Sequence, residues 1–331
     1  MKLVFIAGLF AFSGLLVGQQ SSPATQSQAK SSPGIGAPQL PDLTESTTGY
    51  LENPFVGTQL RIRFDAGFED RTPDRAEFFY GKCGCFRLAG LDPEAPGPGP
   101  GIITNLRFQE YAADFEYAVR TRLSGFAEIP LRGIQPIEFA PGTGSFPNHF
   151  GLGDIRLGLK YALVPEVEHY ISVQFKAYLP SGKADQGLGT HHYSVEPAVL
   201  FQKQLSDRAA LSGQGGVWIP IHGSTRAPVD NGRYPGEVIS YGAGLSYKLS
   251  APDAPLRVTP VIEFLGWNVR GGSVTVPTGI ASASNSNIIN LKAGARLAFK
   301  GKNSIYVGYG RELSDIGWYR DILRTEYRRV F

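Results

Sequence analysis

The chain has little of what several large classes of protein require. Its 331 residues include only two cysteines, too few for a disulfide-rich scaffold or for a zinc site built from four thiolates. Its formal net charge of +3 is small for this length, and its Lys and Arg residues are scattered. The sequence therefore lacks the clustered basic surface of a nucleic-acid-binding protein. We expect no nucleic-acid partner, no metal and no cofactor.

Long apolar runs are confined to the N-terminus. Lys2 precedes LVFIAGLFAFSGLLVG, which ends in small residues and is typical of a signal peptide over residues 1–18. An uncleaved anchor is the alternative, since the run approaches the roughly 17 residues needed to span a membrane. No later window holds ~18 consecutive apolar residues, which excludes an internal transmembrane helix. Residues 19–50 are rich in Ser, Gln, Pro and Thr, which predicts a flexible periplasmic leader.

The chain is rich in glycine, aromatic residues and alternating patterns. Its 41 Gly, 20 Phe and 15 Tyr against one Met favour turn-rich β structure. In GLGDIRLGLKYAL (151–163), every second residue from Ile155 is apolar and the residues between are polar or small. This period of two predicts a strand with one apolar and one polar face. Similar segments recur from about residue 58 to the end, and we count twelve.

The connections between these segments alternate in length. Short ones fall near 123–125 and at 164–168, 206–208, 250–255 and 300–303, and long ones at about 69–104, 133–150, 180–190, 222–236 and 270–286. This is typical of an outer-membrane barrel with short periplasmic turns and long outer loops. We predict an all-β, transmembrane up-and-down antiparallel β-barrel of about 12 strands over residues 51–331, located in the cell outer membrane. Ten or fourteen strands fit the same pattern, and a soluble β-sandwich is the alternative fold.

The polar row of each strand should face the lumen, because Arg or Lys facing lipid at mid-membrane costs about 2–4 kcal/mol. These charges either pair across strands and fill the lumen, or form a selectivity ladder for a solute. The lumen-lining residues that we predict are Arg61, Arg63, Asp114, Glu116, Arg120, Glu128, Arg156, Lys160, Lys176, Glu196, Glu263, Lys292, Arg296 and Arg324.

The other candidate functional residues, for a disulfide, a metal site or catalysis, lie in or near the predicted outer loops. Cys83 and Cys85 lie in the long loop 69–104 and could form a disulfide. Four histidines, at positions 149, 191, 192 and 222, fall near the outer rim, where imidazoles could collect a metal, although loop histidines are common. A hydrolase would need a nucleophile beside a histidine, but His192 and Ser194 lie about 7 Å apart along a strand. With no G-x-S-x-G motif, we predict that the chain is not an enzyme.

Two stretches resemble known outer-membrane proteins. The C-terminal RTEYRRVF ends on Phe331 and resembles the signal that Gram-negative barrel assembly machinery reads, with Arg329 where that signal has an apolar residue. GLGDIRLGLKYAL, YLPSGKADQGLGT and SVEPAVLFQKQL resemble the MetA-pathway of phenol degradation family of outer-membrane proteins. That resemblance covers about residues 150–250 and implies a barrel that passes small hydrophobic or aromatic compounds.

We therefore predict passive passage of small hydrophobic or aromatic solutes through a barrel surrounded by outer-membrane lipids. The alternative is a non-transporting barrel whose outer loops bind a partner or surface ligand. The loop 69–104 is unusually long and contains AEFFYGKCGCF, which could fold inward as a plug or add a strand pair.

Overall fold

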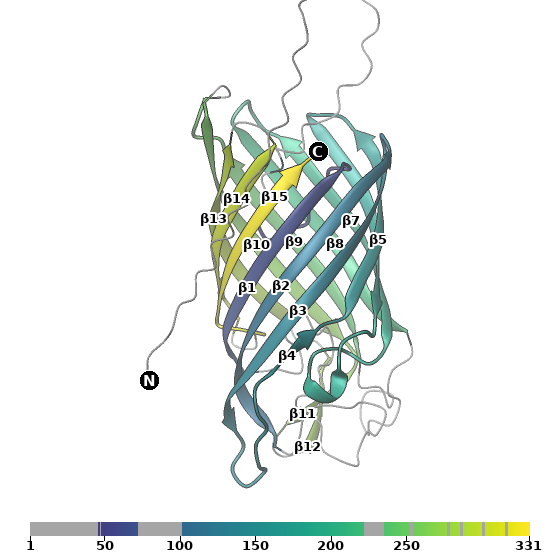
Figure 1. Ribbon diagram of the computed structural model, residues 1–331, viewed down its shortest axis with the longest axis vertical. Helices are drawn as coiled ribbons and strands as arrows, with labels where there is room; N and C mark the ends of the chain where they lie inside the picture. The colour runs from purple at the N-terminus through teal and green to yellow at the C-terminus, as the bar shows by residue number, and fades with distance from the viewer. Residues whose placement is uncertain are drawn as a thin grey trace, which may run out of the picture. The chain divides into compact units, whose positions relative to one another are not determined.

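The computed structural model describes residues 46, 48–71, 101–221, 235–251, 254–276, 279–284, 287–299, 302–314 and 317–331. They form a closed antiparallel barrel of twelve strands (Figure 1), which confirms the predicted fold. β1 pairs with β15, from Gln59↔Val330 to Phe68↔Asp321, and this ladder closes the ring. The barrel strands are β1 (Gln59–Asp70), β2 (Ile103–Arg120), β3 (Leu123–Phe139), β5 (Ile155–Pro165), β6 (His169–Leu179), β7 (Tyr193–Gln204), β8 (Ala209–Ile221), β9 (Glu237–Tyr247), β10 (Leu256–Arg270), β13 (Asn287–Phe299), β14 (Asn303–Glu312) and β15 (Asp321–Val330).

The alternation of side chains gives the wall an apolar outer face and a polar inner face. On β5, Leu157, Leu159 and Tyr161 are 42%, 57% and 43% exposed, whereas Arg156 and Lys160, which alternate with them, are buried. The same contrast recurs around the ring, as expected of a barrel whose outer surface contacts lipid. Other exposed apolar residues of this face are Ile62, Phe115, Phe175, Val199, Leu245, Phe264, Val307 and Leu323. Among the described residues, no helix is long and apolar enough to cross a membrane.

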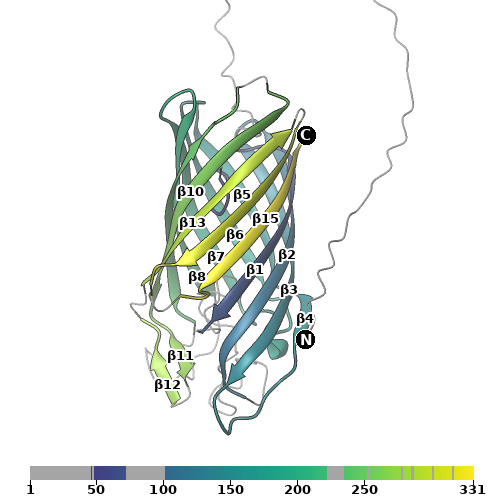
Figure 2. The ribbon, with the colours of Figure 1, turned by 90° about the vertical axis from the view of Figure 1, so that its left-hand side faces the viewer.

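The two ends of the barrel differ in their connections. At one end, here called the turn end, the strands are joined by residues 121–122, 166–168, 205–208, 248–255 and 300–302. β1 begins and β15 finishes at this end. At the other, the loop end, the connections span 71–102, 140–148, 180–192, 222–236, 271–286 and 313–320. The hairpin of β11 (Ser273–Val276) and β12 (Gly279–Ser282) extends at the loop end (Figure 2).

The strand that contains GLGDIRLGLKYAL is interrupted near its loop end. β3 pairs with the short strand β4 (His149–Leu152) and then with β5, and Gly153 and Asp154 lie between the two. The Asp154 carboxylate accepts hydrogen bonds from Gly182 N at 3.0 Å and from Thr190 N and Oγ1 at 2.8 Å. Asp154 thus holds the 180–192 connection, which includes the 3₁₀ turn η3 (Ala184–Gln186), against the barrel.

The outward orientation of β5 can be tested with a charge placed on its apolar face. Replacing Leu159 with Arg should lower the free energy of unfolding by about 2–4 kcal/mol, because the guanidinium would have to enter hydrocarbon. Urea titration of the protein in phospholipid vesicles measures this change. Leu205→Arg, at an exposed position in a turn-end connection, is the matched control and should cost about 0–1 kcal/mol. Equal costs at the two positions would contradict the assigned orientation.

Candidate functional site

Nearly all of the predicted lumen-lining residues lie on the inner face of the wall. Arg120 instead is exposed beside the β2–β3 turn, because the register of the two strands shifts between Ala118 and Arg120. The buried or half-buried members of the predicted row are Arg61, Arg63, Asp114, Glu116, Glu128, Arg156, Lys160, Lys176, Glu196, Glu263, Lys292, Arg296 and Arg324.

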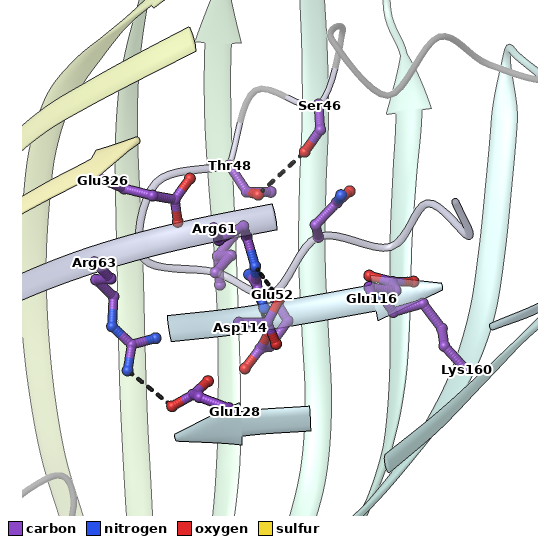
Figure 3. A network of polar contacts seen from close by, with 12 residues as sticks. Ser46, Thr48, Glu52, Arg61, Arg63, Asp114, Glu116, Glu128, Lys160 and Glu326 are labelled. Atoms are coloured by element: carbon purple, nitrogen blue, oxygen red, sulfur yellow. Dashed lines mark hydrogen bonds and ion pairs between the residues drawn. The ribbon is translucent and has the colours of Figure 1, made fainter. Parts of the chain in front are cut away.

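These charges form ion pairs across neighbouring strands. Arg61 Nε lies 2.8 Å from Asp114, and Arg63 Nη2 lies 3.2 Å from Glu128 (Figure 3). Arg63 Nη2 also lies 3.2 Å from Glu110. Such pairing is required, because a buried charge without a partner is strongly destabilising. Further pairs are Arg132–Glu110 at 2.6 Å, Lys160–Glu116 at 3.0 Å, Arg296–Glu326 at 3.0 Å, Arg328–Glu326 at 3.0 Å and Arg324–Asp65 at 2.6 Å.

Part of the lumen is occupied by the chain that precedes β1. We call residues 46 and 48–58 the lumen segment. Ser46 and Thr48 lie inside the ring of strands (Figure 3) and are fully buried. The boundary that the sequence suggested between leader and barrel, at residue 50, falls within this segment. Residues 1–45, including the predicted signal peptide, lie outside the described residues, as does most of the loop at 69–104.

One carboxylate holds the tip of the lumen segment. Glu263 on β10 accepts hydrogen bonds from three consecutive backbone N–H groups, those of Gly49 at 3.0 Å, Tyr50 at 2.7 Å and Leu51 at 3.2 Å. Hydrogen bonds to an ionised acceptor are stronger than those between neutral groups. The buried carboxylate and the three amides therefore satisfy each other.

The carbonyl groups of the lumen segment accept hydrogen bonds from donor side chains of the wall. Arg296 donates to Thr48 O at 2.6 Å, and Arg324 donates to Gly49 O at 3.2 Å. Further along the segment, Ser172 Oγ donates to Pro54 O at 2.7 Å and Lys160 Nζ to Phe55 O at 3.3 Å. Donors from β13, β15, β6 and β5 thus fix one conformation of a segment that has no regular secondary structure of its own.

Glu52 adds an ion pair between the lumen segment and the wall. Its carboxylate contacts Lys176 on β6 and lies 3.9 Å from Arg61 on β1. Burial by itself would raise the pKa of the Glu52 carboxyl, but the two cations lower that pKa well below its ordinary value. Glu52 is therefore ionised at neutral pH, and its attraction to Lys176 and Arg61 ties the lumen segment to β6 and β1.

Close packing at Tyr50 and Gly49 fills the middle of the lumen. The Tyr50 ring lies 4.2 Å below the ammonium of Lys292 and 4.3 Å from the guanidinium of Arg324, which are cation–π distances. A Cβ atom at Gly49 would lie 2.1 Å from the Tyr306 ring, so only glycine fits there. The hydrogen bonds to Glu263 and these ring contacts both involve Tyr50, and we call Tyr50 and Leu51 the tip of the lumen segment.

The loop-end half of the lumen is lined by aromatic and aliphatic side chains. Trp218, Trp267 and Trp318 are all at least 97% buried, and Trp267 and Trp318 lie 4.9 Å apart between ring centroids. Trp318 comes from the 313–320 connection. The other buried members of this half, here called the aromatic half, are Leu106, Phe108, Ile134, Tyr178, Val238, Val269, Ile288, Tyr319 and Ile322.

A small cavity of about 60 Å³ lies where the aromatic half meets the lumen segment. Tyr50 and Glu52 line it from the segment, and Tyr178 and Trp267 line it from the wall. It is large enough for a few water molecules. The described lumen thus has an aromatic half at the loop end and a charged half that the lumen segment occupies.

Some lumen residues that we did not predict lie on strands with a clear alternating pattern, and others lie where the sequence has no such pattern. Asp65 and Glu110 lie on the predicted strands with inward parity, so the alternation could have identified both. The lumen segment gave no such signal, because residues 46–58 have no strand period. Its position depends on Glu263, Arg296 and Arg324, which are more than 200 residues away in sequence.

The remaining candidates do not converge on a second site within the described residues. No group of three or more His, Cys, Asp or Glu side chains there could hold a metal, and His222 lies outside them. His192 Nδ1 lies 3.1 Å from the carbonyl oxygen of Tyr193, and Ser194 is buried on the inner face. Cys83 and Cys85 also lie outside the described residues. Recognition of the exposed Phe331 by assembly machinery stays a prediction.

The chain is similar to known outer-membrane proteins in sequence profile and in fold. Residues 105–317 match the protein family described as "Putative MetA-pathway of phenol degradation". The COG4313 outer membrane channel from Pseudomonas putida F1 is 15% identical with a TM-score of 0.51, covering 86% of this chain and 99% of that chain. The NanC porin is 6% identical with a TM-score of 0.47, covering 82% and 98%. LpxR from Salmonella typhimurium is 10% identical with a TM-score of 0.45, covering 82% and 100%. No curated protein matches the chain.

The role of Glu263 in holding the lumen segment can be tested by hydrogen exchange. In Glu263→Gln the acceptor loses its charge, and charged hydrogen bonds contribute about 1.5–3 kcal/mol, so amides 49–51 should exchange at least about tenfold faster. Mass spectrometry of the peptide covering residues 46–55 measures the rate. Glu128→Gln, which alters a carboxylate paired with Arg63 and Arg156, is the matched control. Exchange equal to wild type in Glu263→Gln would show that this carboxylate does not hold the segment.

Proposed function

The chain belongs to the protein family described as Putative MetA-pathway of phenol degradation, and on this premise we propose that it lets small hydrophobic or aromatic solutes diffuse across the outer membrane. The solute enters at the loop end, and no bond is made or broken and no cofactor takes part. The observation that carries the proposal is that all three tryptophans of the chain lie buried in the aromatic half of one closed barrel.

The aromatic half suits a flat apolar solute for physical reasons. Aromatic pairs gain about 0.5–1.5 kcal/mol beyond the burial of their area when their rings stack with an offset or meet edge to face. The pairs Trp267–Trp318 and Phe108–Tyr319 already adopt tilted and edge-on arrangements with one another. A solute ring could replace one partner of such a pair at little cost, because the solute offers the same kind of contact.

In this proposal the lumen segment closes the axial path. Both arms of the segment lead toward the turn end. Thr58 accepts a hydrogen bond from Phe331 N at 3.0 Å, and Thr48 O is bound by Arg296, which also donates to Ser304 near the start of β14. The tip at Tyr50 and Leu51 packs against the aromatic half. Withdrawal of the segment toward the turn end would therefore join the two halves of the lumen.

The second candidate is a non-transporting barrel whose loop-end connections bind a partner or surface ligand. One observation favours it, since a fixed set of hydrogen bonds and ion pairs holds the lumen segment in the charged half of the lumen. A barrel of this kind would not conduct even when the segment is removed, provided that the wall charges then close the lumen by pairing with each other.

Ion conductance of the purified protein in planar bilayers separates these two functions. A variant that lacks residues 46–56 should conduct substantially more than the full chain, because the wall charges then line an open axial path. A variant that lacks residues 19–45 but keeps the lumen segment is the matched control and should conduct like the full chain. The absence of openings in both variants would contradict the channel and favour the non-transporting barrel.

A further inference from the structure

Two buried arginines near the turn end of the lumen share one carboxylate. Arg296 Nη2 on β13 and Arg328 Nη2 on β15 each lie 3.0 Å from the same oxygen atom, Glu326 Oε1. Each arginine is only 2% exposed, and Glu326 is the acidic partner that the described residues provide for both. A buried charge without a counter-charge is strongly destabilising. The three side chains together therefore lack one negative charge.

A third arginine adds to this imbalance. Arg328 lies directly opposite Arg61 in the ladder between β1 and β15, and both positions face the lumen. Like charges at directly opposite positions of an antiparallel pair destabilise it. Arg61 pairs with two carboxylates, Asp114 at 2.8 Å and Glu52 at 3.9 Å. The ion pair described for Arg328 includes neither of them, so an anion beside Arg61 and Arg328 would relieve their repulsion.

Several N–H groups of this cluster have no acceptor. Within the described part of the chain, Nε and Nη1 of Arg328 and Nε of Arg296 are buried without a hydrogen-bond partner. Buried polar groups nearly always have such a partner. Ser304 lies opposite Arg328 on β14, and its hydroxyl accepts from Arg296 Nη1 at 3.1 Å, which leaves the hydroxyl proton to donate. The cluster therefore offers donors to an acceptor that the described chain does not supply.

The side chains beside these donors are small, which limits the size of that acceptor. Ser304 follows Arg328 around the ring, and Ala298 on β13 follows Ser304. Both are buried. The inner face thus carries a hydroxymethyl and a methyl group next to Arg328 at this level. An acceptor of a few atoms suits such a position, and a larger solute does not.

We propose that this cluster binds one small oxoanion of the size of phosphate. We call it the arginine site, and its residues are Arg61, Arg296, Ser304, Glu326 and Arg328. Guanidinium groups match the oxygen atoms of phosphate in geometry as well as in charge. The Glu326 carboxylate contacts Nη2 of both arginines and leaves the unpartnered N–H groups to the oxoanion. The site belongs to the wall and does not depend on the solute that the barrel passes.

An oxoanion in the arginine site should also hold the lumen segment in place. Arg296 Nη2, which contacts Glu326, also donates to Thr48 O at 2.6 Å. An anion that fixes the Arg296 guanidinium fixes this donor as well. Phosphate should therefore slow hydrogen exchange in the peptide covering residues 46–55 of the wild-type chain and leave it unchanged in Arg328→Gln. Binding without slower exchange would overturn this link to the lumen segment.

Calorimetric titration of the full chain with inorganic phosphate tests the site itself. The chain is held in detergent micelles, and sodium chloride keeps the ionic strength constant. Wild type should bind one phosphate, and Arg328→Gln should bind it at least about tenfold more weakly, because hydrogen bonds from a charged donor are lost. Glu326 keeps Arg296 as its partner in this variant, so no carboxylate is left unpaired.

Arg156→Gln is the matched control, since it also removes one buried cation from the lumen. The two carboxylates that pair with Arg156, those of Glu110 and Glu128, keep Arg63 as a partner. This variant should bind phosphate as wild type does. Absence of binding to wild type, or equal affinity in all three proteins, would overturn the arginine site.

A crystal of the wild-type chain soaked in arsenate locates the anion without any variant. Data measured at the arsenic absorption edge should show an anomalous peak within hydrogen-bond distance of Arg296 and Arg328. Arsenate peaks at other positions only would overturn the site. Either result leaves the proposed passage of solutes standing, because the planar-bilayer experiment tests that function separately.

Discussion

Charges turned into the lumen of this barrel must be neutralised there, because the other face of each strand meets hydrocarbon. The ion pairs between β1, β2, β3 and β5 meet that constraint locally. Elsewhere the lumen segment supplies backbone partners. Three backbone amides donate hydrogen bonds to Glu263, and backbone carbonyls accept from Arg296 and Arg324, which also pair with acidic side chains. The lumen segment is therefore part of the electrostatic balance of the barrel as well as an obstruction within it.

How far the sequence predicts this structure depends on the range of the interactions involved. Alternation is a local signal, so it identified the strands, their outward faces and inward residues such as Arg156 and Lys160. It failed at Arg120, because a shift in strand register is not encoded in the period of one strand. The loop 69–104, which the sequence suggested could fold inward as a plug or add a strand pair, lies mostly outside the described residues, and the structure places residues 46 and 48–58 in the lumen. That segment is ordered by side chains of strands far along the chain, which no local pattern reports.

The two halves of the lumen place opposite demands on a solute. The aromatic half offers apolar contact, and the charged half offers hydrogen bonds and ion pairs that are already satisfied. Contact with the aromatic half stabilises an apolar solute. Entry into the charged half destabilises it, since the solute cannot replace the hydrogen-bond partners or the hydration of a charged group.

Diffraction tests most directly whether the aromatic half receives a small aromatic solute. A crystal of the full chain soaked in bromobenzene and measured at the bromine absorption edge should show an anomalous peak within contact distance of Trp218, Trp267 or Trp318. Bromine peaks confined to the lipid-facing surface, with none in the lumen, would contradict the account.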